Sequence, residues 1–256
     1  MELPKIPIPN QDTAITYEEM LQLKADAYNS KSGSLTGYNC ELCKNKGYIE
    51  KIVDGNEVLA ECKCLKVRDT LYLIKKSGLD KQLRRCTFKN YTCEDEWQHK
   101  ALKLAQSFAD KASGGFFFGG QTGCGKTHLC TAIVGALIKK GMSARYFVWR
   151  EDSMILKTLV NDKGYKEAIN EFKKTDVLYI DDLFKQQNVG DADIKLAFEI
   201  IDSRYREDRI TVISSELNID DIMGIDEAVA GRILQMSRGY QLNIDKDRNK
   251  NYRLRR

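Results

Sequence analysis

Residues 120–127 read GQTGCGKT, and this stretch decides the fold. It has the pattern G-x-x-x-x-G-K-[S/T], which forms a phosphate-binding loop when a strand precedes it and a helix follows it. The aromatic run at 116–118 predicts the strand, and the residues from Lys126 to Gly141 have the apolar spacing of a helix. We therefore interpret the stretch as a P-loop and not as a chance glycine-rich turn.

Each residue type in this loop has a physical role toward a nucleotide. Glycines let the backbone turn tightly and point its N–H groups at phosphate oxygens. We expect Lys126 to neutralise the β- and γ-phosphates of ATP, and Thr127 to place its hydroxyl on Mg²⁺. The predicted nucleotide contacts in the loop are Gly120, Gly123, Cys124, Gly125, Lys126, Thr127 and His128.

Two carboxylates, Asp181 and Asp182, end the apolar stretch VLYIDD. In open α/β sheets, ligands bind outside the carboxyl ends of the strands. Asp181 is therefore predicted to hold Mg²⁺, directly or through water, and Asp182 to orient or deprotonate the attacking water. Paired acids at a strand end can also form a plain turn, but the P-loop upstream favours the catalytic interpretation.

Helical and apolar extended stretches alternate from residue 97 to residue 216, which predicts a mostly parallel sheet with helices on both faces. The strand expected at 144–149 (ARYFVW) falls between the P-loop and the acid pair, an arrangement typical of ring and spiral ATPases. The strand at 211–217 (TVISSEL) ends in polar residues that would face the γ-phosphate or the attacking water. Ser215 is the candidate catalytic residue there.

Four cysteines, at Cys40, Cys43, Cys62 and Cys64, form two close pairs. The polar stretch between the pairs has the turn signal VDGNEV at its centre, which predicts a hairpin that brings the pairs together. Four thiolates in this spacing suit a closed, structural Zn²⁺ site, although the same ligands serve an iron–sulfur cluster and four unrelated free thiols remain an alternative. Four nearby lysines are expected to offset the charge of the site: Lys44, Lys46, Lys63 and Lys66.

The chain has 256 residues, enough for one small and one medium domain. We place the boundary near Gly78, which gives an N-terminal domain at 1–78 and an ATPase domain at 79–256. No window reaches the ~20 apolar residues of a membrane span, and the N-terminus has no secretory signal, so we expect a cytoplasmic protein with reduced thiols. The basic tail at 245–256 accounts for the formal net charge of +4 and is either a phosphate contact or a solvated end.

Together, several stretches resemble the DnaC/DnaI-type helicase loaders, a branch of the AAA+ ATPases, and especially their bacteriophage relatives. These stretches are CELC, CKC, TFKNY, GGQTGCGKTHL, VLYIDDL, AFEIIDSRY, TVISSEL and AGRI. The resemblance implies an α/β fold: a P-loop AAA+ core with a parallel sheet flanked by helices and no full helical lid, preceded by a small zinc-binding α+β domain. It gives Lys126 and Thr127 the Walker A roles and the two aspartates the Walker B roles.

The resemblance also assigns two arginines. Arg232 matches the position of the family's arginine finger, which acts on the nucleotide of a neighbouring subunit, although on spacing alone it is equally an ordinary surface arginine. Arg253, in NYR, matches a terminal motif and is expected to sense the nucleotide. Glu216 stands where the family often has Asn, which puts the efficiency of hydrolysis in question.

By resemblance, the chain is an ATP-dependent loader that binds a replicative DNA helicase in a bacterial host through its N-terminal domain and places it on single-stranded DNA. We expect ATP, Mg²⁺ and Zn²⁺ as cofactors, self-assembly when the helicase is bound, and no membrane partner. The expected DNA contacts are Lys157, Lys163, Tyr165 and Lys166. Two alternatives stay open: an IstB-type transposition helper, and an adaptor that binds ATP without hydrolysing it.

Overall fold

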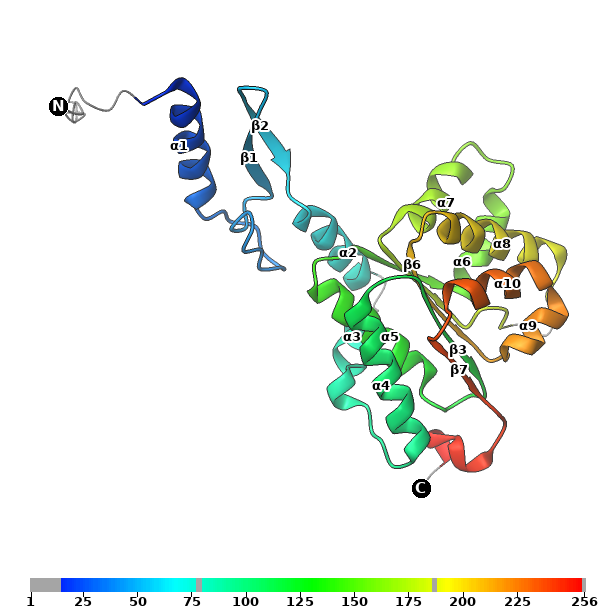
Figure 1. Ribbon diagram of the computed structural model, residues 1–256. Helices are drawn as coiled ribbons and strands as arrows, with labels where there is room; N and C mark the ends of the chain where they lie inside the picture. The colour runs from blue at the N-terminus through cyan, green and yellow to red at the C-terminus, as the bar shows by residue number, and fades with distance from the viewer. Residues whose placement is uncertain (1–14, 77–79, 186–187, 255–256) are drawn as a thin grey trace. The chain divides into compact units, whose positions relative to one another are not determined.

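The computed structural model describes residues 15–76, 80–185 and 188–254 (Figure 1). The backbone divides into two compact units, Met1–Arg68 and Asp69–Arg256. The boundary predicted near Gly78 lies outside the described residues and stays a prediction. No helix in the described part of the chain is long and apolar enough to cross a membrane.

The first unit contains one helix and one hairpin. Helix α1 (Tyr17–Ser30) begins at a capping box in which the Glu19 N–H donates to Thr16 Oγ1 at 3.2 Å and the Thr16 N–H donates to Glu19 Oε2 at 2.8 Å. Strands β1 (Tyr48–Val53) and β2 (Asn56–Glu61) pair antiparallel. The predicted turn is present, with both central residues in the left-handed region (φ 51° and 74°) that such two-residue hairpins require.

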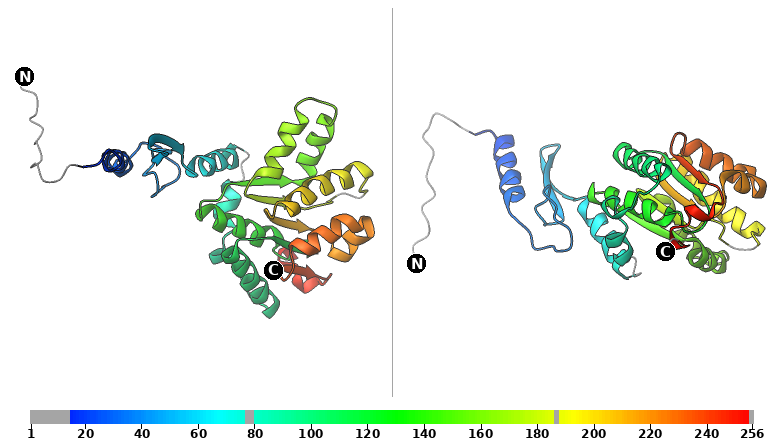
Figure 2. Two further views of the ribbon diagram at one scale, coloured as in Figure 1. Left: turned by 45° about the horizontal axis from the view of Figure 1, so that its top comes forward. Right: turned by 90° about the horizontal axis from the view of Figure 1, so that it is seen from below.

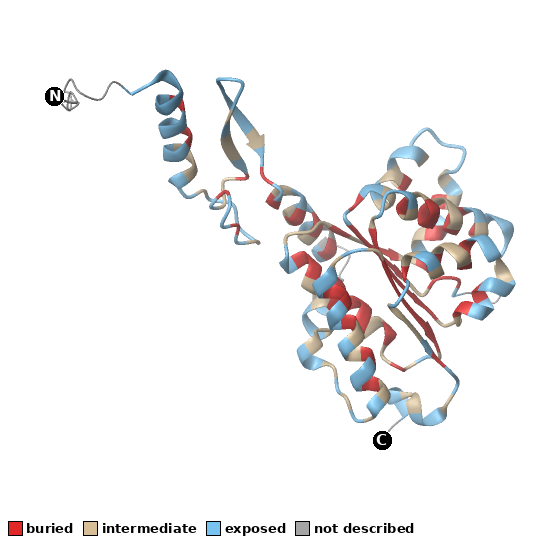
Figure 3. Cartoon of the chain, viewed as in Figure 1, coloured by how far each residue is buried: buried red, intermediate tan, exposed pale blue. Residues whose placement is uncertain are grey.

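Very little of this unit is buried. The hairpin strands are exposed along most of their length (Figure 3). The four paired cysteines are all buried, with the partly buried Tyr38 and Ile49 packed against them, while α1 buries only Leu21 and Ala25. The cysteine cluster is therefore the main organised core of the unit. Helix α2 (Cys64–Lys76) begins at the last of these cysteines and continues past the division between the units.

The second unit is built on five parallel strands in the order β4-β5-β6-β3-β7. Their bounds are β3 (Gly115–Gly120), β4 (Ala144–Val148), β5 (Val177–Asp181), β6 (Ile210–Ser215) and β7 (Gln241–Ile244). Strands β3 and β6 are buried at every residue, which explains their continuous apolar and small-residue sequences. A parallel sheet is what the alternating sequence pattern predicted.

Helices cover both faces of this sheet (Figure 2). Helix α5 contacts β3, β5 and β6 on one face and packs against α4, whereas α8 contacts β6, α10 contacts β3, and α6 and α7 contact β4. The helices are α3 (Asp80–Arg85), α4 (Glu96–Lys111), α5 (Lys126–Lys139), α6 (Trp149–Leu159), α7 (Tyr165–Lys174), α8 (Asp191–Arg206), α9 (Ile219–Ile225) and α10 (Glu227–Met236), with 3-10 turns η1 (Phe88–Asn90), η2 (Arg248–Lys250) and η3 (Tyr252–Leu254).

The sheet has two features that the sequence analysis did not predict. The strand that lies between β3 and β5 in space is β6, which pairs with both, while β4 is at the edge although it falls between them in sequence. Strand β7 was not predicted, because its four residues QLNI are only partly buried and carry no clear alternation. After β7 the described chain, as far as Leu254, forms only the 3-10 turns η2 and η3.

A fully buried arginine orders the turn between α7 and β5. Arg204 of α8 donates to the backbone carbonyl oxygens of residues 172, 173, 175, 176 and 210, and its Nε donates to Thr211 Oγ1 at 2.9 Å. Every nitrogen of its guanidinium is therefore used inside the fold. Although Arg204 lies within AFEIIDSRY, one of the stretches that carry the family resemblance, its contacts are structural.

Candidate nucleotide and metal sites

A cavity of about 680 Å³ in the second unit lies around the P-loop. The described residues that line it come from α3 and η1, from the P-loop, from the ends of β5 and β6, and from the C-terminal tail. They are Lys81, Gln82, Arg85, Cys86, Asn90, Tyr91, Thr92, Gln98, Thr122, Gly123, Cys124, Gly125, Lys126, Thr127, His128, Asp182, Lys185, Glu216, Tyr252 and Arg253.

Two glycines of the P-loop have little room for a side chain, Gly120 because of a neighbouring backbone and Gly123 because of a neighbouring side chain. A Cβ atom on Gly120, where φ is 117°, would lie 2.1 Å from the carbonyl oxygen of Ile244 in β7. A Cβ atom on Gly123 would lie 2.0 Å from Asn251 Oδ1, and the Tyr252 N–H donates to the Gly123 carbonyl at 2.9 Å. The strand and tail after α10 thus form one wall of the loop, which the sequence alone did not predict.

The lysine of the loop contacts the loop backbone, and the threonine contacts the end of β5. Lys126 is 6% exposed, and its Nζ donates to the carbonyl oxygens of Gly120 and Gln121, both at 2.8 Å. Thr127 Oγ1 lies 3.5 Å from Asp181 Oδ1, so the hydroxyl and the carboxylate predicted to hold Mg²⁺ come together from α5 and β5. A hydroxyl and a carboxylate are hard oxygen donors of the kind that Mg²⁺ prefers, and both therefore fit the ion.

Asp181 is held by two hydroxyl groups that the sequence analysis did not assign. Tyr179 Oη donates to Asp181 Oδ1 at 2.5 Å, and Ser214 Oγ donates to the same oxygen at 2.7 Å. Burial raises the pKa of Asp181, and these two hydrogen bonds oppose that shift. The signal for Tyr179 was its place two residues before Asp181, since alternate residues of a strand share a face.

Asp182 points toward a second group of charges. Its backbone is in the left-handed region (φ 57°), and its N–H donates to Ser214 Oγ at 3.0 Å. Its Oδ2 lies 2.7 Å from Lys185 Nζ, which also lies 3.1 Å from Glu216 Oε1. Thr122 Oγ1 of the P-loop donates to the same Glu216 oxygen at 2.8 Å. Lys185 was missed because nothing in its local sequence marks a lysine as facing the cavity.

Ser215 has a different place from the one predicted. It is fully buried, its Oγ donates to the Leu183 carbonyl at 2.7 Å, and it accepts from the Leu217 N–H at 3.1 Å. It is not among the described residues that line the cavity. Ser215 therefore shapes the loop after β5, and its neighbour Ser214 is the serine that contacts the aspartates.

The two predicted arginines lie apart. Arg253 lines the cavity, as do Cys124 and His128. Arg232, on α10, does not line the cavity of its own chain: its Nε donates to Asp202 Oδ1 at 2.8 Å, and its guanidinium stacks 4.8 Å from the ring centroid of Tyr205. The finger and sensor roles stay predictions.

Two of the four predicted DNA contacts are already engaged within the fold. Lys157 Nζ lies 2.6 Å from Asp193 Oδ1, and Tyr165 Oη donates to Glu199 Oε2 at 2.7 Å. Lys163 and Lys166 are exposed. The exposed lysines are therefore better placed for a phosphate backbone than the tyrosine is for stacking.

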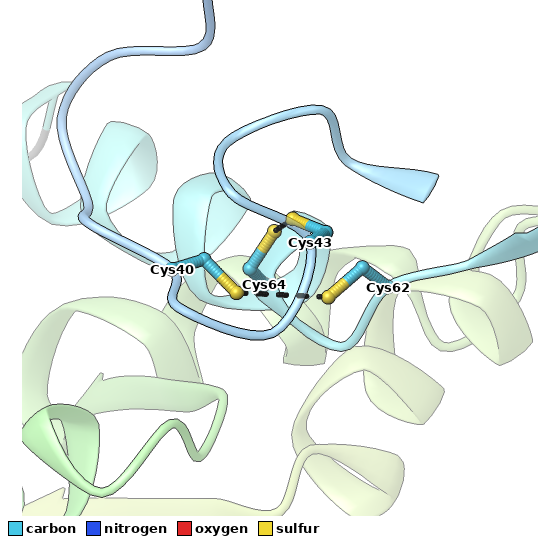
Figure 4. A group of neighbouring side chains, drawn as sticks. All are labelled: Cys40, Cys43, Cys62 and Cys64. Carbon is cyan, nitrogen blue, oxygen red and sulfur yellow. Dashed lines mark hydrogen bonds between the residues drawn. The ribbon is translucent and has the colours of Figure 1, made fainter. Parts of the chain in front are cut away.

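The four cysteines of the first unit come together as predicted (Figure 4). The Sγ atoms of Cys40 and Cys62 are 3.7 Å apart, those of Cys43 and Cys64 are 3.4 Å apart, and all four lie within 4.8 Å of one another. Thiolates about 2.3 Å from a tetrahedral Zn²⁺ lie about 3.8 Å from each other. The cluster therefore fits a four-thiolate zinc ion.

Two of the four lysines expected to offset the charge of this cluster have other partners. Lys44 Nζ donates to the Ser30 carbonyl at 3.0 Å, and Lys46 Nζ donates to the Asn29 carbonyl at 3.2 Å, so both lysines fasten the end of α1 and do not face the sulfurs. The groups next to the sulfurs are the Gly47 N–H, 3.3 Å from Cys43 Sγ, and the Arg68 guanidinium beside Cys64. Burial raises the pKa of the Cys64 thiol, and Arg68 opposes that shift.

Known proteins resemble this chain in sequence over most of its length. Residues 41–255 match the family described as IstB-like ATP binding protein. The chain is 32% identical over 202 residues to the uncharacterized protein YqaM of Bacillus subtilis (strain 168), covering 73% of this chain and 64% of YqaM. It is 31% identical over 224 residues to the phage-like element PBSX protein XkdC of the same organism, covering 81% of this chain and 82% of XkdC.

A third relative is the replicative helicase loader DnaC of Escherichia coli (strain K12), which is 27% identical over 152 residues, covering 57% of this chain and 62% of DnaC. The chain thus spans less than two thirds of the length of YqaM and of DnaC. The crystal structure of the DnaC helicase loader superposes with a TM-score of 0.58 at 24% identity, covering 64% of this chain and 99% of that chain. This likeness confirms the predicted AAA+ fold.

Proposed function

The chain belongs to the family of IstB-like ATP binding proteins, in the branch that resembles DnaC-type loaders and their phage-element relatives, and from this premise we propose that it is an ATP-dependent loader of a replicative DNA helicase. The observation that carries the proposal is that the P-loop and the second carboxylate of the acid pair line one cavity, in a chain that has a cysteine-built unit ahead of its AAA+ core. In this proposal the protein works in the bacterial cytoplasm.

The nucleotide site would bind ATP with Mg²⁺. Lys126 would leave the carbonyl oxygens of its own loop and bind the β- and γ-phosphates, while Thr127 and Asp181 would hold the ion. Mg²⁺ would neutralise charge on the phosphate oxygens. Asp182 would accept a proton from the water that attacks the γ-phosphorus, and ADP would leave with the bridging oxygen. Hydrolysis would release the helicase.

The first unit would bind the helicase. Its cysteine cluster would hold Zn²⁺, because a unit with so little other buried surface needs the metal to stay folded. Helix α1 then presents three exposed apolar side chains, Tyr17, Met20 and Leu23, and a fourth, Ile15, lies just before its N-cap. Exposed apolar side chains gathered on one helix are typical of a docking surface for another protein.

Assembly would complete the site. Arg232 lies outside the cavity of its own chain, and a guanidinium in that place acts on a nucleotide only when a second subunit supplies the phosphates. The proposal therefore includes self-association on the helicase, with Lys163 and Lys166 free to contact single-stranded DNA.

The test is complex formation with a bacterial replicative helicase, followed by size-exclusion chromatography with light scattering, with and without ATP. We expect a complex at micromolar concentration that Leu23→Glu weakens and Met154→Glu leaves intact, since both leucine and methionine are exposed but only Leu23 is on α1. If wild type forms no complex with or without ATP, or if both variants behave alike, the loader proposal is wrong.

The non-hydrolysing adaptor has support in the ion pair between Lys185 and Asp182, which occupies the predicted catalytic acid. Steady-state ATPase rates of wild type, Lys126→Ala and Asp182→Asn decide between the two. Under the loader proposal only wild type hydrolyses ATP, with DNA and helicase present. If none of the three does, the adaptor is the better assignment.

The transposition helper has support in the description of the family itself. ATP-dependent filaments on duplex DNA, seen by electron microscopy and absent with single-stranded DNA, would favour that function over helicase loading.

A further inference from the structure

Lys185 lines the nucleotide cavity within a charge arrangement to which the loader proposal gives no role. Lys185 Nζ lies between two carboxylates, 2.7 Å from Asp182 Oδ2 and 3.1 Å from Glu216 Oε1. All three residues line the cavity, and the Glu216 carboxylate also accepts a hydrogen bond from Thr122 of the P-loop at 2.8 Å. The three charges therefore form a bridge from the P-loop to the loop after β5.

The position of this bridge along a bound nucleotide follows from its neighbours. Lys126 and Thr127 mark the β- and γ-phosphates and the ion, and Asp181, which meets Thr127, is adjacent in the chain to Asp182. Arg85 of α3 and Tyr91, the residue after η1, also line the cavity, and the Tyr91 ring lies beside His128 of α5. Because Asp182 follows the aspartate that meets Thr127, we infer that the bridge faces the terminal phosphate of a triphosphate, a group that a diphosphate lacks.

Both acids of the bridge would repel a γ-phosphate if they stood alone. Burial raises the pKa of Glu216, but hydrogen bonds from Thr122 and Lys185 outweigh it and lower the pKa, so this carboxylate is ionised at neutral pH. Burial lowers the pKa of Lys185, but its bonds to Asp182 and Glu216 outweigh it and raise the pKa, so the ammonium is charged. The charge of Lys185 thus offsets one of the two negative charges of Asp182 and Glu216, at the place where the negatively charged γ-phosphate would bind.

We propose that Lys185 determines the preference of this site for a nucleoside triphosphate over a diphosphate, by neutralising Asp182 and Glu216 where they face the terminal phosphate. This inference rests on the proposed nucleotide site but not on helicase loading, and it needs no hydrolysis. Without Lys185, two carboxylates face the γ-phosphate at short range in a partly buried setting, where like charges repel strongly. ADP has no phosphate in that position.

The experiment measures the affinities of the full chain for ATP and for ADP, each with Mg²⁺, by titration calorimetry. Lys185→Met is expected to weaken ATP about tenfold or more and to change ADP less than about twofold, as repulsion at a few ångströms predicts. Lys185→Arg keeps the charge and is expected to keep the preference. The matched control is Lys173→Met, which removes a lysine paired with Glu199 at 2.6 Å outside the cavity and is expected to change neither affinity.

Two further variants separate charge from structure. In the Lys185→Met background, Glu216→Gln removes one of the unpaired acids and is expected to restore most of the ATP affinity. Glu216→Gln alone, with Lys185 present, is expected to tighten ATP relative to ADP. Equal weakening of both nucleotides by Lys185→Met, no recovery in the double variant, or a wild type that binds neither nucleotide would each overturn the inference. Failure to bind a helicase would leave these affinities unchanged, so the two proposals fail separately.

Discussion

The influence of strand β7 on the P-loop can be tested by comparing the substitution Gly120→Ala with Gly239→Ala. Both glycines have positive φ, 117° and 81°. A Cβ atom on Gly120 would meet the Ile244 backbone at 2.1 Å from oxygen and 2.8 Å from carbon and nitrogen, whereas a Cβ atom on Gly239 meets nothing within 4 Å. Gly239 therefore isolates the cost of the backbone conformation, and Gly120 adds the collision with β7.

The two costs differ in size. An alanine in the left-handed region at position 239 costs about 1–2 kcal/mol. At position 120 the backbone is in a region nearly restricted to glycine, which costs ~1–3 kcal/mol, and forcing a methyl group into a packed site adds ~1–3 kcal/mol. Ile244 cannot relieve the collision by rotating a side chain, because the atoms concerned belong to its backbone. The collision should separate β7 from β3 and remove the Gln121 N–H to Ile244 carbonyl bond.

The free energy of unfolding is measured by urea titration of the full chain, followed by tryptophan fluorescence. The chain has two tryptophans, Trp97 and Trp149, and both lie in the second unit, so the signal reports that unit. We expect Gly120→Ala to lose more stability than Gly239→Ala and also to lose ATP binding, while Gly239→Ala keeps it. Equal losses of stability, or normal ATP binding by Gly120→Ala, would refute the idea that β7 sets the requirement for glycine.

Three other perturbations test separate parts of the fold. Removal of the metal with a chelator, or the substitution Cys64→Ser, is expected to abolish amide-exchange protection in residues 15–68, because the cysteine cluster is the main core of that unit. Tryptophan fluorescence should stay unchanged, and metal analysis should find one zinc per chain. A chain that is purified without metal and still shows this protection would contradict the prediction. Burial raises the pKa of Asp152 from 3.8 to about 6, so the folded state binds this proton more tightly than the unfolded state. The stability that this group contributes therefore falls as the pH rises between those values. Asp152→Asn should remove that part of the pH dependence of the urea midpoint between pH 4 and pH 7, and an unchanged pH dependence would show that Asp152 is not its source. Arg204→Met leaves several buried carbonyl oxygens without donors and is expected to lower the free energy of unfolding, by the same urea assay, by more than about 3 kcal/mol. Arg204→Lys should not restore that stability, because one ammonium group cannot replace the several donors of a guanidinium.

The sequence predicted the parts of this protein that depend on local pattern. The P-loop, the acid pair and the cysteine pairs each rest on spacing within a few residues, and the structure places Thr127 beside Asp181 and the four sulfurs within reach of one ion. The helix start at Thr16 and the hairpin turn at Asp54 were read from short signals of the same kind.

The features that could not be predicted from the sequence depend on contacts between distant segments of the chain. Lys185 faces the cavity because the loop after β5 turns through left-handed residues, which no periodicity reports. The strand order places β6 and not β4 between β3 and β5, and order in a sheet is set by packing of whole layers. The sequence does not distinguish Ser214 from Ser215, because a polar run at the end of a strand does not show which hydroxyl faces the aspartates.

Arg204 has a consequence for how this chain tolerates change. Apart from Thr211, it binds its neighbours through main-chain oxygens, from residues that lie 28 to 32 positions earlier and at position 210. Main-chain oxygens are the same whatever amino acid carries them, so these bonds do not depend on the side chains of residues 172–176. The path of this turn therefore depends on a single side chain that lies about thirty positions further along the chain.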